Sequence, residues 1–366
     1  RSNWSGSPYP THSAYLMYIE AFTCHKDPLR QLDNDDRLVT YAGRLFAVID
    51  GVTDKSGIRL PDGSSRGQAA CSLIETTLRD VVDEGIAMTA STATLLARLQ
   101  TAFEAAYLRH GIADAVAADP HLRFGAQLAA VFFDGAAWRV LVVGDCGVRI
   151  DGHRTVGGSN PGDAVLALWR AKVFNAVIAN SAPHTPAPHD DALAVARSYT
   201  VAGSGRFLEE HADLLPYPDY LRCRTESHRQ AATAFPAVPR PLLEEALSQG
   251  LIGLAKHRNQ PGVLGAACLD GSAVPPEHAH DEVVGAAAIS TIELFSDGYF
   301  GKPPRGAITV ADWEAHLAYV EATDPYKVGA YPSTKGSSSG RFTDDRSVLI
   351  INTLRGDEAQ VGSGRA

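Results

Sequence analysis

The sequence has little of what marks several common protein classes. Its 366 residues include only 5 cysteines, none in a Cys-x-x-Cys pair, which excludes a disulfide scaffold and a thiolate zinc knuckle and indicates a reducing compartment. No block of five Lys or Arg residues occurs and the formal net charge is −9, so nucleic acid and anionic membranes are not expected partners. No apolar run reaches the roughly 18 residues of a membrane helix. We therefore expect a cytoplasmic globular protein.

What the chain does contain is an alternation of strand-like and helix-like segments. Aromatic and β-branched residues predict strands at 15–24, 37–49, 126–133, 138–143, 262–269, 283–295 and 347–352. Apolar residues at helical spacing predict helices at 67–83, 92–110, 163–178, 193–197, 242–256 and 310–320. This alternation by itself predicts a mixed α and β fold. Residues 1–13 and 355–366 lack periodicity and are expected to be loose termini.

Residues 157–260 differ from the segments around them. The predicted elements there are helices joined by Pro- and His-rich connections. The segment is expected to be a helical insertion, which either caps a site or adds a helical layer.

Aspartates stand repeatedly where apolar strand-like runs end or begin. They occur in Ile49-Asp50-Gly51, Gly144-Asp145-Cys146, Ser296-Asp297-Gly298, Asp344-Asp345 and Asp35-Asp36. Any one of them reads as an ordinary turn. Together they would repel one another at a sheet edge unless their pKa values rise or a divalent cation binds, and all-oxygen ligands favour Mg²⁺ or Mn²⁺ over Zn²⁺.

The order of these motifs resembles that of the metal-dependent type 2C protein phosphatases. The matching segments are Asn34-Asp35-Asp36, Phe46-Ala47-Val48-Ile49-Asp50-Gly51, Gly144-Asp145-Cys146, Leu294-Phe295-Ser296-Asp297-Gly298 and Asp344-Asp345-Arg346-Ser347. The resemblance implies an α+β fold, an αββα sandwich of two mainly antiparallel sheets flanked by helices. It also implies a phosphatase-like catalytic domain over residues 14–354, with the insertion at 157–260 inside it.

The resemblance further implies a set of metal ligands. Asp50 would bridge two ions, Asp35 and the Gly51 carbonyl would complete one site, and Asp297 and Asp344 would complete the other. Asp145 would help Asp297 to hold a third, weaker ion. The cofactor is expected to be Mn²⁺ or Mg²⁺.

The implied reaction is the hydrolysis of phosphate monoesters, on phosphoserine or phosphothreonine in a phosphorylated protein or on a small phosphomonoester. Two cations would activate a bridging hydroxide and neutralise the phosphoryl oxygens. The catalytic residues are expected to be Asp50, Arg30, which would grip the phosphate, and Asp36. Asp36, Lys55 and a metal-bound water are the candidate proton donors to the leaving oxygen.

Departures from the family pattern keep other functions open. The Gly-rich turn of the family becomes Gly51-Val52-Thr53-Asp54-Lys55, which motivates a non-catalytic module that binds a phosphorylated partner or senses metal. A hydrolase of another ester is a third hypothesis. Glu277-His278-Ala279-His280-Asp281-Glu282 also has the composition of a metal site, although Pro275-Pro276 marks a loop there.

Overall fold

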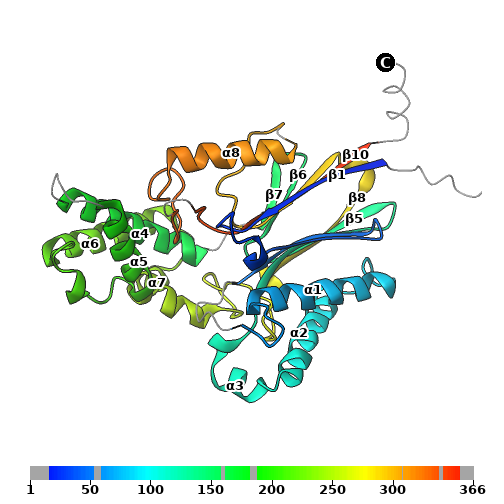
Figure 1. Cartoon of the computed structure of the whole chain (residues 1–366), viewed down its shortest axis with the longest axis horizontal. Coiled ribbons are helices and arrows are strands. Elements are labelled where there is room, and N and C mark those ends of the chain that lie inside the picture. Colours follow the sequence, from blue (N-terminus) through cyan, green and yellow to red (C-terminus); the bar gives the residue numbers. More distant parts are fainter. Residues whose placement is uncertain are drawn as a thin grey trace, which may run out of the picture.

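Two antiparallel β-sheets packed face to face form the centre of the structure (Figure 1). The structure is a computed structural model, which describes residues 16–52, 59–157, 161–181, 188–306, 308–337 and 341–354. The first sheet has the strand order β1 (Leu16–Cys24), β10 (Arg346–Leu354), β9 (Thr291–Phe295), β6 (Gly147–Ile150) and β7 (Arg154–Gly157). The second has the order β2 (Arg37–Tyr41), β3 (Leu45–Gly51), β4 (Ala126–Phe133), β5 (Ala137–Val143) and β8 (Ala279–Gly285). Each pair of neighbouring strands is antiparallel.

The alternation of side chains along β3 shows why this strand is apolar almost throughout. Phe46 and Val48 face the other sheet and join the core between the two sheets. Ala47 and Ile49 point the opposite way and join the core beneath the helices. Because successive side chains of a strand alternate between faces, a strand covered on both sides needs apolar residues at every position.

Helices cover both outer faces of the sandwich. The helices α1 (Arg66–Asp83) and α2 (Thr92–Arg109) share a core with the second sheet, and α8 (Val310–Thr323) packs on the first. The shorter helices are α3 (Ala113–Ala118) and the 3₁₀ turns Gln31–Asp33, Pro120–Leu122, Glu209–His211, Ala255–His257, Pro276–His278 and Ala286–Ala288. The predicted αββα sandwich is therefore confirmed.

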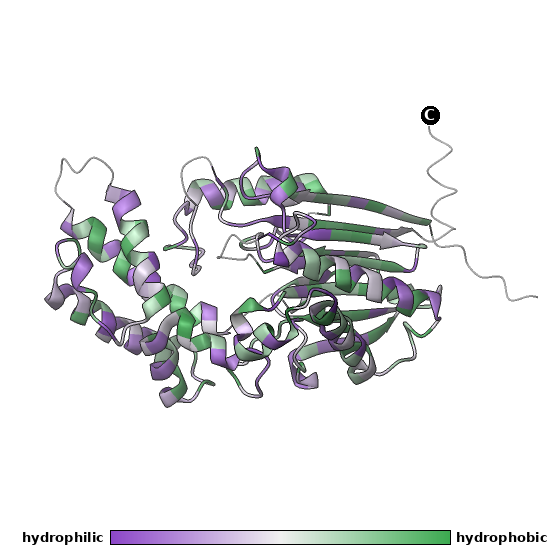
Figure 2. Cartoon of the chain, turned by 60° about the horizontal axis from the view of Figure 1, so that its bottom comes forward, coloured by the Kyte–Doolittle hydropathy of each residue, from purple (hydrophilic) through white to green (hydrophobic). Residues whose placement is uncertain are grey.

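Four helices between β7 and β8 form a separate hydrophobic core. They are α4 (Pro161–Asn180), α5 (Pro188–Ala202), α6 (Tyr217–Ala234) and α7 (Arg240–Leu254). Trp169, Tyr199 and Tyr220 pack edge to face or tilted at the centre of this core. Figures 1 and 2 both show the four helices beyond one end of the two sheets. We call this unit the helical insertion. Among the described helices, none is both long and apolar enough to cross a membrane.

The structure differs from the predicted elements in several places, and α3, β6 and β7 are among the elements that were not predicted. The predicted strand 37–49 is a hairpin, with Ala42 and Gly43 at positive φ of 51° and 63° in the turn. The predicted strand 283–295 is divided between β8 and β9, which belong to different sheets. Residues 262–269 take part only in isolated bridges, and α6 was not predicted. Tertiary pairing, which local patterns do not encode, decides each of these cases.

Candidate metal centre

Antiparallel pairing brings the aspartates at the strand ends to one end of the sandwich. The directions of β3 and β5 are the same because each is antiparallel to β4, which lies between them. Asp50, near the end of β3, and Asp145, two residues after β5, therefore lie at the same edge of the sheet. In the other sheet β9 ends where β10 begins, which places Asp297 beside Asp344 and Asp345. The strand ends alone therefore account for most of the acidic residues gathered here.

Three of the predicted ligands form one group. One carboxylate oxygen from each of Asp50, Asp145 and Asp297 lies within 4.8 Å of the other two, and all three residues are half-buried. Asp145 also lines a cavity of about 440 Å³ that extends to Pro161, at the start of α4. The group is therefore bordered by a space that a small ligand can enter.

Burial and mutual repulsion raise the pKa values of this group. Burial, followed by the charges of Asp36, Asp297 and Asp145, raises the pKa of Asp50 well above its usual range. Burial, followed by the charges of Asp297 and Asp163, raises the pKa of Asp145 to about 7. Within the described part of the chain, the buried Asp145 Oδ1 has no hydrogen-bond partner. Carboxylates in this state gain stability from any cation that binds between them.

Asp36 lies next to this group, and its negative charge contributes to the raised pKa of Asp50. Its Oδ2 accepts a hydrogen bond of 2.8 Å from the Ser296 hydroxyl, while its Oδ1 is buried without a hydrogen-bond partner among residues that the structure describes. Burial raises the pKa of Asp36 to about 7, the hydrogen bond from Ser296 opposes this shift, and the charge of Asp345 adds to it.

Asp35 and Gly51 lie together near the N-terminus of α1. The Ser65 hydroxyl, which caps α1, donates a hydrogen bond to Asp35 Oδ1. A Cβ atom added at Gly67 would lie 3.1 Å from both Asp35 Oδ1 and the Gly51 carbonyl carbon. The structure thus brings these two predicted ligands side by side, although Asp35 is not one of the group of three.

The carboxylate of Asp345 binds backbone amides from the segment around Lys26 and Asp35. It accepts hydrogen bonds of 3.0 Å from the Lys26 amide and 2.9 Å from the Asp35 amide. A Cβ atom at Gly298 would lie 1.9 Å from the Asp345 carbonyl oxygen, so only glycine permits this approach of the two strand ends. Asp345 therefore fixes the positions of its neighbours.

Asp344, a predicted ligand, makes ion pairs with two lysines. The Lys335 ammonium donates a hydrogen bond to Asp344 Oδ2, and the Lys26 ammonium lies 3.5 Å from Oδ1. The carboxylate is buried. Its charge is balanced here by the two ammonium groups.

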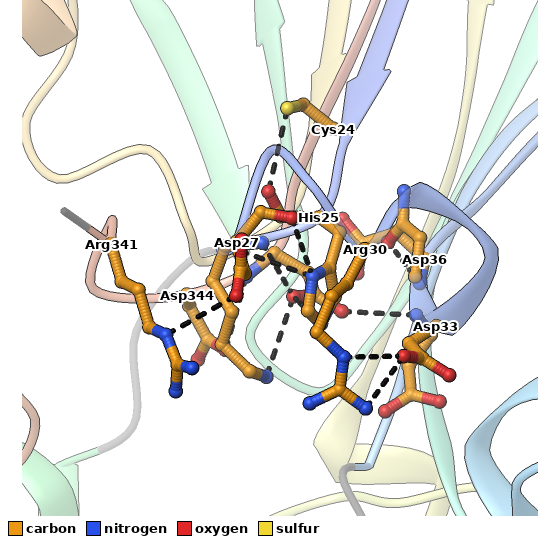
Figure 3. Close-up of polar contacts among 12 residues, drawn as sticks. Cys24, His25, Asp27, Arg30, Asp33, Asp36, Arg341 and Asp344 are labelled. Carbon is orange, nitrogen blue, oxygen red and sulfur yellow. Dashed lines mark hydrogen bonds and ion pairs between the residues drawn. The ribbon is translucent and has the colours of Figure 1, made fainter.

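The predicted phosphate-binding arginine is directed elsewhere. Arg30 is exposed, and its Nε and Nη2 atoms each lie 2.7 Å from Asp33 Oδ2 (Figure 3). The structure does not bring Arg30 to the three carboxylates. Lys55, a candidate proton donor, lies outside the described residues.

The donor set fits a hard divalent cation. It consists of carboxylate oxygens, two of which, on Asp36 and Asp145, are buried without hydrogen-bond partners in the described segments. Mg²⁺ and Mn²⁺ prefer such oxygen ligands. Asp50, Asp145 and Asp297 are the residues that would hold an ion first, because their oxygens already converge.

The alternative histidine motif forms no comparable group. His278 lies in a 3₁₀ turn, with its Nε2 atom 2.9 Å from the Gln260 carbonyl oxygen. His280 lies on β8, with its Nε2 atom 3.3 Å from Glu282. The only set of three potential ligands found among the described residues is Asp50, Asp145 and Asp297.

Sequence reasoning missed two charged residues that influence the centre. Lys335 lies in the loop before Asp344, and its positive charge lowers the pKa values of Asp50 and Asp145 against the larger effect of burial. Asp163 lies in the first turn of α4, and its charge acts on Asp145 and on Lys335. Neither stands next to a strand, so the pattern that predicted the other acids gave no signal for them.

Comparison with known proteins gives structural matches only. No family model matches the chain, and no curated protein matches it. The fold is similar to the catalytic domain of the serine/threonine protein phosphatase PstP in complex with two manganese ions, with 16% identity, 93% of this chain and 100% of that chain covered, and a TM-score of 0.41.

Two further solved structures are similar at the same level. The serine/threonine phosphatase PstP/Ppp of Mycobacterium tuberculosis has 16% identity, covers 92% of this chain and 98% of its own, and gives a TM-score of 0.39. Stp1 of Staphylococcus aureus has 10% identity, covers 93% of this chain and 96% of its own, and gives a TM-score of 0.38. At these scores the similarity alone assigns no activity, and the functional argument rests on the residues of the centre.

Proposed function

We propose that this chain is a metal-dependent phosphatase that hydrolyses phosphate monoesters, with phosphoserine or phosphothreonine in proteins as the substrate class. The observation that carries the proposal is the convergence of Asp50, Asp145 and Asp297, whose oxygens lie within 4.8 Å of one another. The sequence supports the proposal through its ordered series of motifs, which has an acidic residue at each predicted carboxylate position.

The proposed ligand sets are those that the resemblance to the type 2C phosphatases implies. Asp50 would bridge two ions of Mn²⁺ or Mg²⁺. Asp35 and the Gly51 carbonyl, which lie side by side, would complete one site, and Asp297 and Asp344 the other. Asp145 would contribute to a third site with Asp297, to which it is close.

The chain's own groups would position the substrate and move protons. When bound, the ions would supply Lewis acidity and lower the pKa of the attacking water. The buried carboxyl of Asp36, held by Ser296 at 2.8 Å, would donate a proton to the leaving oxygen as the phosphorus–oxygen bond breaks. The helical insertion begins beside Asp145, where it would contact the part of the substrate outside the phosphate.

Hydrolysis of p-nitrophenyl phosphate, measured with EDTA, Mg²⁺ and Mn²⁺, tests the proposal. We expect turnover that requires a divalent cation and is abolished by Asp50→Asn and by Asp297→Asn. Asp114→Asn, which changes an exposed aspartate of α3, is the matched control and should retain full activity.

The substrate class needs a separate panel. A phosphoserine peptide, a phosphothreonine peptide, a sugar phosphate and a carboxylic ester would be compared at equal concentrations. Preference for the peptides would support a protein phosphatase, whereas preference for the sugar phosphate would redirect the proposal to a metabolite.

A folded protein that binds Mn²⁺ but turns over none of these compounds would contradict the enzymatic proposal. Phosphopeptide binding that survives Asp50→Asn would then favour a binding module.

A further inference from the structure

Lys335 approaches the candidate metal centre from the loop before β10. Its ammonium donates a hydrogen bond to Asp344. The negative charges of Asp297, Asp50 and Asp145 also act on this ammonium. The ammonium is therefore close enough to all four carboxylates to act on their charge.

The loop that carries Lys335 is anchored by the helical insertion. Arg170 of α4 is buried, with 2% of its surface exposed. Its Nη1 atom lies 2.8, 3.1 and 3.2 Å from the carbonyl oxygens of Tyr326, Lys327 and Ser333. By hydrogen bonding to three carbonyl oxygens, the Arg170 guanidinium fixes the backbone immediately before Lys335.

A second anchor follows Lys335. The Ser337 amide donates a hydrogen bond of 3.1 Å to the Pro325 carbonyl, and the Ser337 hydroxyl donates one of 2.5 Å to Glu321 of α8. The Lys335 side chain itself is 52% exposed. The backbone at Lys335 is thus fixed on both sides, whereas the side chain has room to redirect its ammonium.

The charge of the centre requires a cation beyond the metal ions. The five proposed ligand side chains, those of Asp35, Asp50, Asp145, Asp297 and Asp344, carry five negative charges when ionised, one more than two divalent ions balance and one fewer than three. A phosphate monoester then adds nearly two more negative charges at neutral pH. A positive side chain in contact with the phosphoryl oxygens would offset part of this excess, as lysines do in other phosphate sites.

We propose that Lys335 binds the phosphoryl group of the substrate, in the role that sequence reasoning gave to Arg30, and that Arg170 positions the loop for this contact. The inference rests on the proposed phosphatase function. If a divalent ion takes Asp344, the ammonium would lose its present partner and would be able to turn to the phosphoryl oxygens, with Asp163, whose charge also acts on Lys335, as the competing negative group. The guanidinium of Arg30 is exposed and pairs with Asp33.

Binding of inorganic phosphate to the Mn²⁺-loaded protein, measured by calorimetry, tests the inference without turnover. A hydrogen bond to a charged group contributes enough that Lys335→Met should weaken phosphate binding by about 10- to 100-fold. Lys335→Arg should restore most of the affinity, and Mn²⁺ titration should give the same stoichiometry in each variant. Lys256→Met, which removes an exposed lysine paired with Glu245, should bind phosphate normally.

Lys26→Met separates a specific contact from general charge. Lys26 also pairs with Asp344, at 3.5 Å, and with Asp345, at 3.3 Å. If this variant loses as much phosphate affinity as Lys335→Met, the effect is one of net charge and the inference fails. The inference also fails if Lys335→Met binds phosphate with normal affinity. If this variant in addition binds one more Mn²⁺ ion than the wild type, the lysine only occupies a metal position. A wild-type protein that binds no Mn²⁺ would instead refute the proposed function itself.

The positioning role of Arg170 has its own readout. Arg170→Met should weaken phosphate binding, and in a double-mutant cycle with Lys335→Met the two losses should not add. Additive losses, or a fall in melting temperature with unchanged phosphate affinity, would leave Arg170 a purely structural residue and overturn this part of the inference.

Discussion

Two groups of buried charge in the same sandwich are built in opposite ways. In the middle of the first sheet, Arg149 on β6 and Glu293 on β9 are 2% and 0% exposed, and Arg149 Nε lies 3.0 Å from both Glu293 oxygens. The Pro303 carbonyl and the Trp313 indole complete the hydrogen bonds of this pair. At the end of the sandwich, Asp50, Asp145 and Asp297 converge, and the positive charge that acts on Asp50 and Asp145 is that of Lys335.

The difference separates a structural charge pair from a binding site. The charges of Arg149 and Glu293 balance each other, and both side chains are hydrogen-bonded within the protein, so the pair does not require a ligand. The aspartate group is left with excess negative charge and, on Asp145, a buried oxygen without a hydrogen-bond partner in the described residues. Burial of carboxylates in this state costs stability, which protonation or a bound cation recovers.

The largest effect is expected when the aspartate group loses its central member. Asp50→Asn should reduce turnover by several orders of magnitude, because the electrostatic stabilisation of the transition state is removed, and should also weaken Mn²⁺ binding. Steady-state kinetics and Mn²⁺ titration would measure the two losses. The melting temperature of the metal-free protein should not fall, because Asn removes a repelling charge. A lower melting temperature would mean that Asp50 is structural.

The charge pair should show the reverse behaviour. Arg149→Met leaves Glu293 buried without its partner, which is expected to cost about 3–5 kcal/mol of unfolding free energy, measurable by urea denaturation. The double variant Arg149→Met/Glu293→Leu should recover much of this loss. Mn²⁺ affinity of the folded fraction should stay unchanged in both variants. A loss of metal binding would contradict the separation of the two groups.

Acidity should report on the aspartate group. Asp36 and Asp145 have pKa values of about 7 in the folded protein, against an ordinary value of 3.8. Between these values the folded state holds more protons than the unfolded state, so the free energy of unfolding falls as pH rises from about 4 to about 7 and levels off above.

Thermal melting of EDTA-treated protein across this range would measure the decline. Asp145→Asn should flatten the curve, and saturating Mn²⁺ should raise the melting temperature most at the high-pH end. A metal-free protein whose stability increases from pH 4 to pH 7 would contradict the electrostatic picture of this centre.

A smaller effect is expected from the hydrogen bond that supports Asp36. Ser296→Ala removes a donor to Asp36 Oδ2 and an acceptor, at 2.9 Å, for the Ser347 amide. The loss should destabilise the fold by about 1 kcal/mol and raise the pKa of Asp36 further. The alkaline limb of the pH–rate profile, where a proton donor loses its proton, should therefore move to higher pH, and an unchanged profile would exclude Asp36 as the proton donor.

The sequence predicted the candidate metal ligands best where an aspartate stands at the end of an apolar strand. Asp50 directly follows the apolar run of β3, and Asp297 follows that of β9 after a single residue, Ser296. Antiparallel pairing of such strands is sufficient to bring their ends together. Sequence reasoning assigned Asp35 to a metal site and Asp36 to catalysis, but it could not predict that Asp35 turns to Ser65, because that contact depends on the packing against α1.

Other features depend on contacts that have no local signal. Lys335 stands nine residues before Asp344 in a segment without periodicity, and its place is set by hydrogen bonds to Arg170, which is distant in the sequence. The helix α6 is similarly hidden, because its buried face is formed by Tyr220, Cys223, Ser227 and Ala231, of which only two are typical core residues.

The pairing of β1 with β10 has a consequence for biosynthesis. Residues 16–24 pair along their whole length with residues 346–354, so the first described strand has no neighbour on that side until more than 300 residues have left the ribosome. Asp344 and Asp345 directly precede this late strand. A nascent chain released before that point would hold only part of the ion-binding residues, and we expect premature termination products to be inactive and exposed to proteolysis.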